Sequence, residues 1–289
     1  MGHALARVGR LYDACAKSYA MYHEGTGCMH MPTYVPGCKS RAECLDATTR
    51  IILEALEARP GDMVLDLGCG VGTLAVEVAR MTGSSVCGLA ATATEVRAAA
   101  DRAKTEGVGN LCGFEVRDMN SVGSLTWPNL RAIITLETDC YLHPLAERIK
   151  DIRRILPRGG VWQNIRFGIR DEFRTSAKAR RAIHYVEDAW RTGPIASRAE
   201  FRRHVRGEFE IEKTVDLSDR VVDFWRKFVP VPLDGGSRVR LRFMGASLAE
   251  SQSFWDVRTV FRHRLAFWKM VLGMAAGWFV YEYYRLRAI

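Results

Sequence analysis

Short apolar runs alternate with amphipathic segments through the middle of the chain. Each run has the length of a buried strand, and the segment after it repeats its apolar residues at helical spacing. Because strands and helices alternate in this way, the sequence predicts an α/β fold with a doubly wound, mainly parallel sheet. The predicted strands span residues 63–67, 85–89, 111–116, 131–136 and 161–165.

The pattern changes on both sides of this core. Residues 1–40 are rich in tyrosine and histidine and cannot make a core of their own, so we expect a helical lid or oligomerisation segment. Residues 166–210 and 221–269 predict helices with a strand at 209–215 between them, and an aromatic strand at 278–285 closes the chain. We expect the last two strands to form an antiparallel hairpin at the edge of a seven-stranded sheet.

A glycine-rich turn follows the first predicted strand. Residues 66–72 read Asp-Leu-Gly-Cys-Gly-Val-Gly, and glycine lets the backbone turn tightly and approach a ligand because it has no Cβ to collide. A dinucleotide site would read G-x-G-x-x-G and place an acid about 20 residues further on. The next strand ends instead in Ala90-Ala91, so the D-x-G-x-G-x-G spacing favours a different nucleotide-type cofactor.

Polar residues gather at the predicted carboxyl ends of the strands. In open α/β sheets, ligands bind outside those ends, at the switch in strand order. Thr92 and Glu95 also have the spacing of a helix capping box. The residues that we expect at this crevice are Asp66, Gly68, Gly70, Gly72, Thr92, Asp118 and Glu137.

Composition places the chain among ordinary globular proteins. Of its 289 residues, 48% are apolar and 26% are charged, which suits one catalytic domain with an insertion. The eight cysteines include no C-x-x-C pair, so we expect small buried hydrophobes in a reducing compartment rather than a disulfide or zinc framework. The N-terminus lacks the apolar core of a signal peptide, and the most apolar window, 270–281, is too short to span a bilayer. We expect a cytoplasmic protein without stable membrane insertion.

The net charge of +9 is distributed unevenly. Between Arg166 and Arg206, eleven Lys or Arg stand against five Asp or Glu. Such a segment attracts a polyanion, a diphosphate or an acidic surface, and an ordinary solvated helix face explains it equally well. The charge alone does not identify a partner.

Three segments resemble the successive motifs of the class I S-adenosylmethionine (SAM) methyltransferases, in the branch of sterol and terpene C-methyltransferases. They are Leu65–Gly72, Gly88–Val96 and Arg154–Gly160. Within that branch, the chain looks most like the prenyl-diphosphate C-methyltransferases, such as those acting on geranyl diphosphate. The matching segments are Leu136-Glu137-Thr138 with Tyr141 after it, Ile183-His184-Tyr185, Phe224-Trp225 and Phe279-Val280-Tyr281. The likeness is strong at the glycine turn and loose after residue 166.

This resemblance implies a Rossmann-like class I methyltransferase domain over residues 41–289, with residues 166–210 as a helical substrate cap, and SAM as the cofactor. It implies cofactor contacts from Asp66, Gly68, Gly70, Gly72, Thr92, Glu95, Asp118, Met119 and Leu136. It implies substrate contacts from Tyr22, His184, Tyr185, Trp225 and Tyr281, with Trp190 as a further aromatic candidate.

The implied reaction is methyl transfer to the alkene of an isoprenoid. An alkene is a weak nucleophile, so positioning of its π bond supplies part of the rate. Methylation leaves a tertiary carbocation, which aromatic faces stabilise, and loss of a proton restores the alkene. Glu137, at the end of the fourth predicted strand, is our choice for the base.

Several alternatives remain open at this point. The family's Asn-Ile-His after its His-Tyr is absent here, so the substrate is either a free prenyl diphosphate or a prenylated scaffold such as an indole alkaloid. The first would use arginines such as Arg166 and Arg170, with or without Mg²⁺. The chief rival is O- or N-methylation of another small metabolite, because the fold does not fix the acceptor. We expect no protein metal site and no nucleic-acid partner, and we expect a homo-oligomer through the N-terminal segment.

Overall fold

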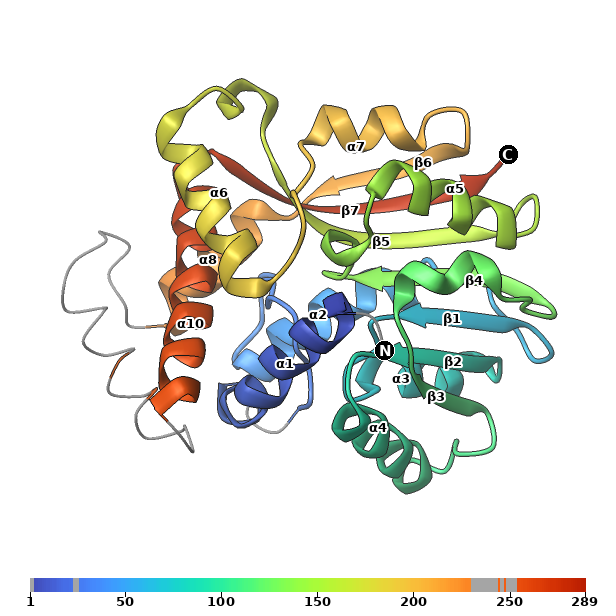
Figure 1. Cartoon of the computed structure of the whole chain (residues 1–289). Helices are drawn as coiled ribbons and strands as arrows, with labels where there is room; N and C mark the ends of the chain where they lie inside the picture. Colours follow the sequence, from blue (N-terminus) through green and yellow to red (C-terminus); the bar gives the residue numbers. More distant parts are fainter. Residues whose placement is uncertain (1–2, 23–25, 230–243, 245–246, 248–253) are drawn as a thin grey trace.

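A computed structural model describes residues 3–22, 26–229, 244, 247 and 254–289. Its centre is a seven-stranded sheet in the order β3-β2-β1-β4-β5-β7-β6 (Figure 1). The pairs among the first five strands of that order are parallel, and β7 is antiparallel to both β5 and β6. The strands are β1 (Met63–Leu67), β2 (Ser85–Ala90), β3 (Cys112–Val116), β4 (Leu130–Leu136), β5 (Val161–Ile169), β6 (Phe209–Asp216) and β7 (Phe279–Ala288). The predicted fold class is confirmed.

Helices cover both faces of this sheet. One face packs mainly against α2, α3, α8 and α10, and the other packs against η1, α5 and α7. The α-helices are α1 (His3–Tyr22), α2 (Arg41–Leu53), α3 (Thr73–Thr82), α4 (Ala93–Thr105), α5 (Leu145–Ile155), α6 (Ala177–Trp190), α7 (Arg198–Val205), α8 (Ser218–Phe228) and α10 (Phe254–Ala275). The short 3-10 turns are η1 (Met119–Ser124), η2 (Asp139–Tyr141) and η3 (Asp171–Phe173).

β5 is longer than the sequence predicts. It continues past residue 165 to Ile169, and every residue of it is buried. Its last residues pair with the start of β7, with Arg166 opposite Glu282. A charged residue such as Arg166 does not predict a buried strand from the sequence. In the structure, Asp139 stabilises the buried Arg166 side chain through a hydrogen bond of 2.8 Å. Part of the expected cap is therefore sheet.

The rest of residues 166–210 divides between two places. α6 packs along α10, and α7 lies with α5 on the opposite face of the sheet. The helix that the sequence predicts over residues 221–269 is divided as well. Its two parts are α8 and α10, and residues 230–243 between them lie outside the described part of the chain. The division into a lid of residues 1–40 and a domain of 41–289 stays a prediction.

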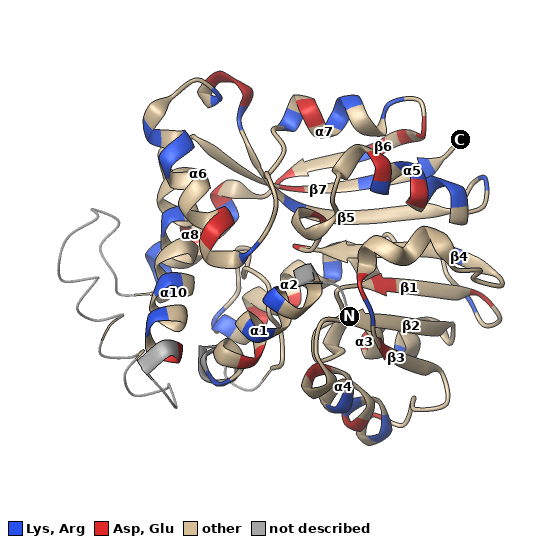
Figure 2. Cartoon of the chain, in the orientation of Figure 1, with Lys and Arg blue, Asp and Glu red and all other residues tan. Residues whose placement is uncertain are grey.

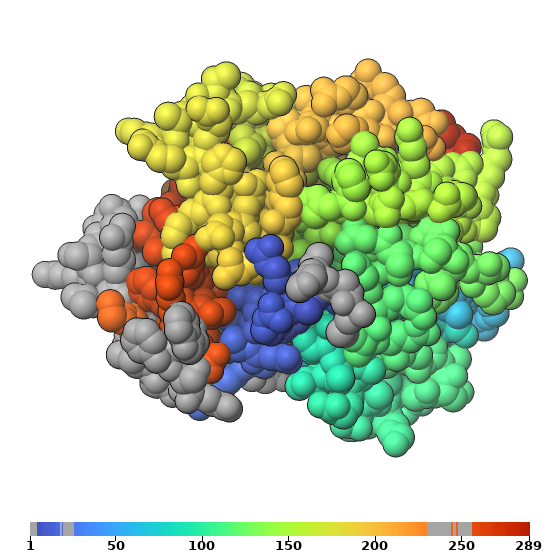
Figure 3. Space-filling model, viewed as in Figure 1, coloured from blue at the N-terminus to red at the C-terminus, as the bar shows by residue number. Residues whose placement is uncertain are grey.

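α1 packs across the ends of the central strands. Leu11 and Cys15 form a small apolar cluster with Val260 of α10. Gly9 faces the turn after β2, where an added Cβ would lie 3.3 Å from the carbonyl oxygen of Ala91. In Figure 3, α1 lies in the middle of the visible face, between α6 and α10 on one side and α4 on the other.

Ion pairs within the fold neutralise part of the positive charge of residues 166–206. Arg166 is buried against Asp139, while Arg170 and Arg198 both pair with Asp216. Other cations of the segment remain exposed along α6 (Figure 2). Among the described residues, no helix is long and apolar enough to cross a membrane.

Candidate functional site

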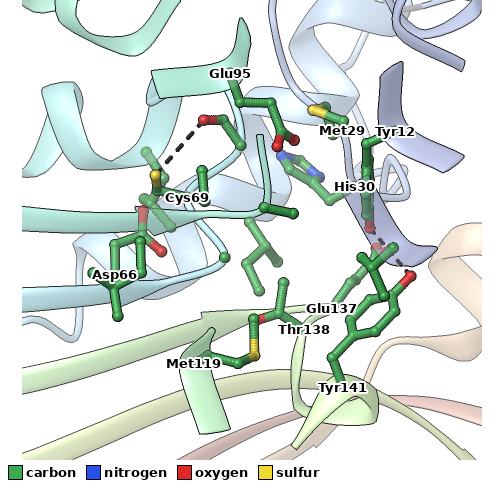
Figure 4. A pocket seen from close by; sticks show the side chains of 18 of the residues that line it. Tyr12, Met29, His30, Asp66, Cys69, Glu95, Met119, Glu137, Thr138 and Tyr141 are labelled. Atoms are coloured by element: carbon green, nitrogen blue, oxygen red, sulfur yellow. Dashed lines mark hydrogen bonds between the residues drawn. The ribbon is translucent and has the colours of Figure 1, made fainter. Parts of the chain in front are cut away.

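A pocket of about 380 Å³ opens at the carboxyl ends of β1, β2 and β4, beneath α1 (Figure 4). Its wall joins two groups of residues. The glycine turn, the start of α4 and the end of β3 form one end, and α1, α6 and α10 form the other. This is the edge at which the sequence places the cofactor and substrate.

The glycine turn adopts backbone angles that favour glycine. Gly68, Gly70 and Gly72 have φ values of 88°, 53° and 78°. A Cβ on Gly68 would lie 2.4 Å from the Thr138 side chain, and one on Gly72 would lie 2.7 Å from Cβ of Ala99. Gly68 and Gly70 line the pocket, whereas Gly72 does not. Gly72 therefore serves the packing of α3 against α4 rather than a direct contact with a ligand in the pocket.

Asp66 lies near the end of β1 and lines the pocket, and one of its carboxylate oxygens is covered and unpaired. Its residue is 2% exposed, and its Oδ2 atom has no hydrogen-bond partner among the described residues. Burial raises the pKa of this carboxyl to about 7. A buried acceptor without a donor fits a cationic or hydrogen-bond-donating ligand group, so the amino-acid ammonium of SAM suits this position.

Thr92 and Glu95 form the capping box predicted from the sequence. The Thr92 hydroxyl accepts from the Glu95 N–H, and Oε2 of Glu95 accepts from the Thr92 N–H, each at 3.1 Å. Glu95 also lines the pocket, but Thr92 does not. Thr92 therefore positions α4 and Glu95 instead of facing the pocket itself.

The remaining predicted cofactor residues all lie in the wall. Asp118, Met119 and Leu136 line the pocket at the ends of β3 and β4. Oδ1 of Asp118 accepts from both the N–H and the side-chain amide of Asn120, at 2.9 and 2.8 Å. These bonds hold the η1 turn and fix the orientation of the carboxylate.

Glu137 follows β4 and points into the same pocket. Its φ of 61° is unusual for a residue other than glycine. Its Oε1 atom accepts from the Met31 N–H at 2.5 Å and from the Tyr281 hydroxyl at 2.7 Å. Burial raises its pKa to about 7, although both hydrogen bonds act in the opposite direction. Oε2 carries no bond to a described residue and is the oxygen available to accept a proton.

Aromatic rings form the other end of the pocket. The Tyr12 hydroxyl donates to that of Tyr141 at 3.3 Å, and the Tyr141 hydroxyl donates to the Trp190 carbonyl at 2.9 Å. Figure 4 shows Tyr12 and Tyr141 meeting beside Glu137. His263 lies 5.9 Å from Trp190 between ring centroids. Tyr19 and Phe267 complete this aromatic end.

The predicted substrate residues are placed unequally. Tyr281 reaches the site through Glu137, but Trp225 is buried behind it, 6.0 Å from Phe267. Tyr185 lies beneath the cations of Arg262 and Lys269, outside the wall. The His184 side chain is 73% exposed and pairs with Glu187. The side chain of Tyr22 lies outside the described part.

Periodicity explains why His184 and Tyr185 point away. Ile183, Val186, Ala189 and Trp190 form the buried stripe of α6, so His184 falls on its outer face. Conversely, the sequence does not identify Tyr12, His263 or Phe267 as pocket residues, because α1 and α10 reach the site only through long-range packing. The tyrosines of the N-terminal segment were the one local signal for Tyr12.

The sheet order and the glycine turn at the carboxyl end of β1 are those of the Rossmann-like methyltransferase fold. Residues 35–125 match the family model described as "Methyltransferase small domain". This match covers the glycine turn and the first three strands of the sheet.

Relatives named as methyltransferases match parts of the chain. Over 119 residues, covering 41% of this chain and 42% of the relative, the chain is 29% identical to the methyltransferase GfsG of Streptomyces halstedii. Over 206 residues, covering 68% of this chain and 55% of the relative, it is 26% identical to 24-methylenesterol C-methyltransferase 2 of Oryza sativa subsp. japonica. The chain thus spans about half the length of these curated relatives.

A solved structure resembles the whole chain. It is the geranyl diphosphate C-methyltransferase from Streptomyces coelicolor A3(2), in complex with Mg²⁺, geranyl diphosphate and S-adenosyl-L-homocysteine. The TM-score is 0.70 at 17% identity, with 100% of this chain and 98% of that chain covered. At this identity the likeness shows the fold. Together, the matches confirm the resemblance to the sterol and terpene branch that the motifs indicate.

Proposed function

We propose that the protein transfers a methyl group from SAM to an alkene carbon of an isoprenoid. The observation that carries this proposal is the environment of Glu137. Its carboxyl has a raised pKa, and it lies in a pocket that is lined by aromatic rings at the end away from the glycine turn. The sterol C-methyltransferase among the relatives supports the substrate class. The alternative, O- or N-methylation, uses the same fold and remains the rival.

The residues at one end of the pocket suit SAM. Asp66 contributes a carboxylate to the wall, and Gly68 and Gly70 line the pocket beside it. Asp118 and Met119 lie at the end of β3, where they suit the adenine amino group and ring face. When bound, SAM supplies an electrophilic methyl group.

The other residues act on the acceptor. A new carbon–carbon bond forms between the alkene and the methyl group while the carbon–sulfur bond breaks, and the positive charge moves to the neighbouring carbon of the isoprenoid. The faces of Tyr12 and Tyr141, which meet beside Glu137, stabilise this cation by about 0.5–2 kcal/mol each. Oε2 of Glu137 accepts the proton whose loss restores a double bond.

A raised pKa suits Glu137 to this role. With a pKa of about 7 the carboxylate is ionised in a useful fraction at neutral pH, and it is a stronger base than an ordinary glutamate. The two donors on Oε1 keep the side chain in one orientation.

We propose Mg²⁺ only together with a diphosphate acceptor, as in the geranyl diphosphate C-methyltransferase complex. Among the described residues, no group of three or more His, Cys, Asp or Glu could hold a metal ion. Mg²⁺ would enter with a diphosphate substrate.

We also propose a homo-oligomer that forms through the N-terminal segment. Size-exclusion chromatography of a chain lacking residues 1–30 tests it. If the truncated protein keeps the same number of chains per particle as the full chain, the proposal is rejected.

The test is an incubation with methyl-labelled SAM and a panel of geranyl diphosphate, farnesyl diphosphate and prenylated indoles, with and without Mg²⁺. The expected product carries the label on carbon, and Glu137→Gln abolishes it. Glu147→Gln is the matched control, because that glutamate is exposed on α5. Label found only on oxygen or nitrogen of other acceptors would move the protein to the rival class.

A further inference from the structure

α10 brings a buried histidine to the aromatic end of the pocket. His263 is 7% exposed and lines the wall. Its Nδ1 atom is covered by neighbouring atoms and has no hydrogen-bond partner among the described residues. Nε2 makes no hydrogen bond to a described residue either, and it is the ring nitrogen left for a ligand in the pocket. A ring nitrogen in a pocket wall without a partner indicates a ligand group that pairs with it.

The neighbouring polar groups are already paired. Tyr12 and Tyr141 are bonded to each other and to the Trp190 carbonyl. Nε2 of His143 accepts from the Gly193 N–H at 2.8 Å. His263 is therefore the side chain at this end, among those described, that offers an unsatisfied polar atom.

The chemistry of His263 suits a neutral partner. Tyr19 packs edge-on against its ring at 5.2 Å, and Trp190 lies on another side. Burial, with a smaller contribution from Arg264, lowers its pKa to about 4, so the ring is neutral near pH 7. A neutral imidazole offers one donor and one acceptor, which matches a hydroxyl, a carbonyl or an amide.

The same pocket is poorly suited to a diphosphate in its described part. Two arginines line it, and each already pairs with a carboxylate: Arg117 with Glu115 and Arg191 with Asp188. A doubly charged head buried beside a neutral imidazole would lack its counter-charge. The polar atoms present therefore favour an uncharged head.

We propose that His263 is a specificity-determining residue, which hydrogen-bonds an uncharged polar head of the isoprenoid substrate. The head would lie at the α6–α10 end, and the reacting alkene would lie nearer Glu137 and the glycine turn. This inference rests on the proposed function for the isoprenoid chain, and it narrows the substrate class to prenyl alcohols, ketones, esters or amides.

The test compares ligands that share one carbon skeleton. Myrcene has no polar head, geraniol has a hydroxyl and geranyl diphosphate is charged. Dissociation constants are measured by tryptophan fluorescence with saturating S-adenosylhomocysteine present. The expected result is that geraniol binds about five- to tenfold more tightly than myrcene and more tightly than geranyl diphosphate.

Variants assign the preference to one side chain. His263→Phe keeps a ring between Tyr19 and Trp190. We expect the ratio of the dissociation constant for myrcene to that for geraniol to fall to about one in this variant. His263→Gln, which keeps a donor and an acceptor, should restore part of the preference. His204→Phe on α7 is the matched control, because that histidine is outside the pocket wall. Unchanged affinity for S-adenosylhomocysteine verifies folding, and a variant that fails this check is replaced by His263→Leu.

Two results would overturn the inference: an unchanged ratio in His263→Phe, or tighter binding of geranyl diphosphate than of geraniol in the unmodified protein. The readout is binding, so it does not depend on methyl transfer. A His263-dependent preference without any C-methylated product would reject the proposed function alone. A C-methylated product with no dependence on His263 would reject this inference alone.

Discussion

The Tyr281 hydroxyl donates a hydrogen bond of 2.7 Å to Oε1 of Glu137, although 144 positions separate the two residues. The sheet makes this contact. Tyr281 on β7 lies opposite Phe167 of β5, and the Glu137 N–H donates to the Ile165 carbonyl of the same strand. β5 therefore positions both residues of this hydrogen bond. Through Tyr281, the antiparallel last strand contributes directly to the chemistry proposed at the end of β4.

Replacing Tyr281 by phenylalanine should make Glu137 harder to ionise. The hydroxyl stabilises the charged carboxylate, so its loss raises the pKa of Glu137 above its value of about 7. We expect the acid limb of the pH profile of kcat to move up by about one pH unit. The measurement is methyl transfer at saturating substrate from pH 5 to pH 9.

Tyr283→Phe is the matched control for that experiment. Tyr283 lies on the same strand, is equally buried, and donates to Oε1 of Gln163 at 2.9 Å instead. Its variant should keep the limb of the unmodified protein. A limb that moves equally in both variants would show a general effect on β7 and contradict the positioning role of Tyr281.

The raised pKa of Glu137 also predicts a pH-dependent stability. The folded pKa of about 7 exceeds the ordinary 4.5, so the folded state binds more protons between these values. Its contribution is present below about pH 4.5 and is lost as the pH rises through 7. Glu137→Gln should thus match the unmodified protein at pH 4.5 and exceed its free energy of unfolding at pH 8.5 by roughly 2 kcal/mol, because water reaching the pocket reduces the full effect.

Urea unfolding at the two pH values measures this difference. The glutamine amide oxygen can still accept from Met31 and Tyr281, so the comparison isolates the charge. Glu147→Gln should show no such pH-dependent gain, since its side chain is 65% exposed. Equal stabilities of Glu137→Gln and the unmodified protein at pH 8.5 would contradict the assigned pKa direction.

Asp66 gives a prediction about cofactor binding. Its pKa is raised to about 7 by burial, and an ammonium group binds the ionised form. The affinity for S-adenosylhomocysteine should therefore fall as the pH drops below 7. Well below pH 7, each further pH unit should raise the dissociation constant by up to about tenfold. Asp66→Asn should bind about 10- to 100-fold more weakly at pH 8 and show a flat pH profile.

Calorimetric titration between pH 5.5 and 8.5 tests this prediction. Asp101→Asn, an exposed acid on α4, should retain both the affinity and the pH dependence of the unmodified protein. If Asp66→Asn keeps the pH dependence, another group controls it, and Asp66 would be assigned to ordering the glycine turn.

Much of the sheet could be predicted because its signals are local. β1, β2 and β4 begin and end within one residue of the predicted strands, since each is a short apolar run bounded by turn residues. β5 could not be predicted in full, because Arg166 becomes a strand residue only when Asp139 is folded against it. The two residues of this pair are 27 positions apart, so the pair produces no periodic pattern in the sequence.

The candidate site divides in the same way. The sequence predicts Asp66, Gly68 and Gly70, which line the pocket, because the strand and the glycine turn are adjacent in the chain. Tyr12 and His263 enter the pocket on two helices that meet through Leu11 and Val260, and no short-range pattern reports that meeting. His184 illustrates the reverse case, in which a family-like motif falls on the exposed face of a helix.

Gly72 provides the last prediction, which separates packing from ligand contact. A Cβ at Gly72 meets Cβ of Ala99 at 2.7 Å, and its φ of 78° disfavours any other residue. Gly72→Ala should therefore lower the free energy of unfolding by roughly 2–4 kcal/mol. Gly113→Ala on β3 is the control, because its Cβ would meet nothing within 4 Å. Under conditions where Gly72→Ala remains folded, its affinity for S-adenosylhomocysteine should stay within a few-fold of the unmodified protein, since Gly72 is outside the pocket wall. A large loss of affinity with unchanged stability would instead place Gly72 against the cofactor.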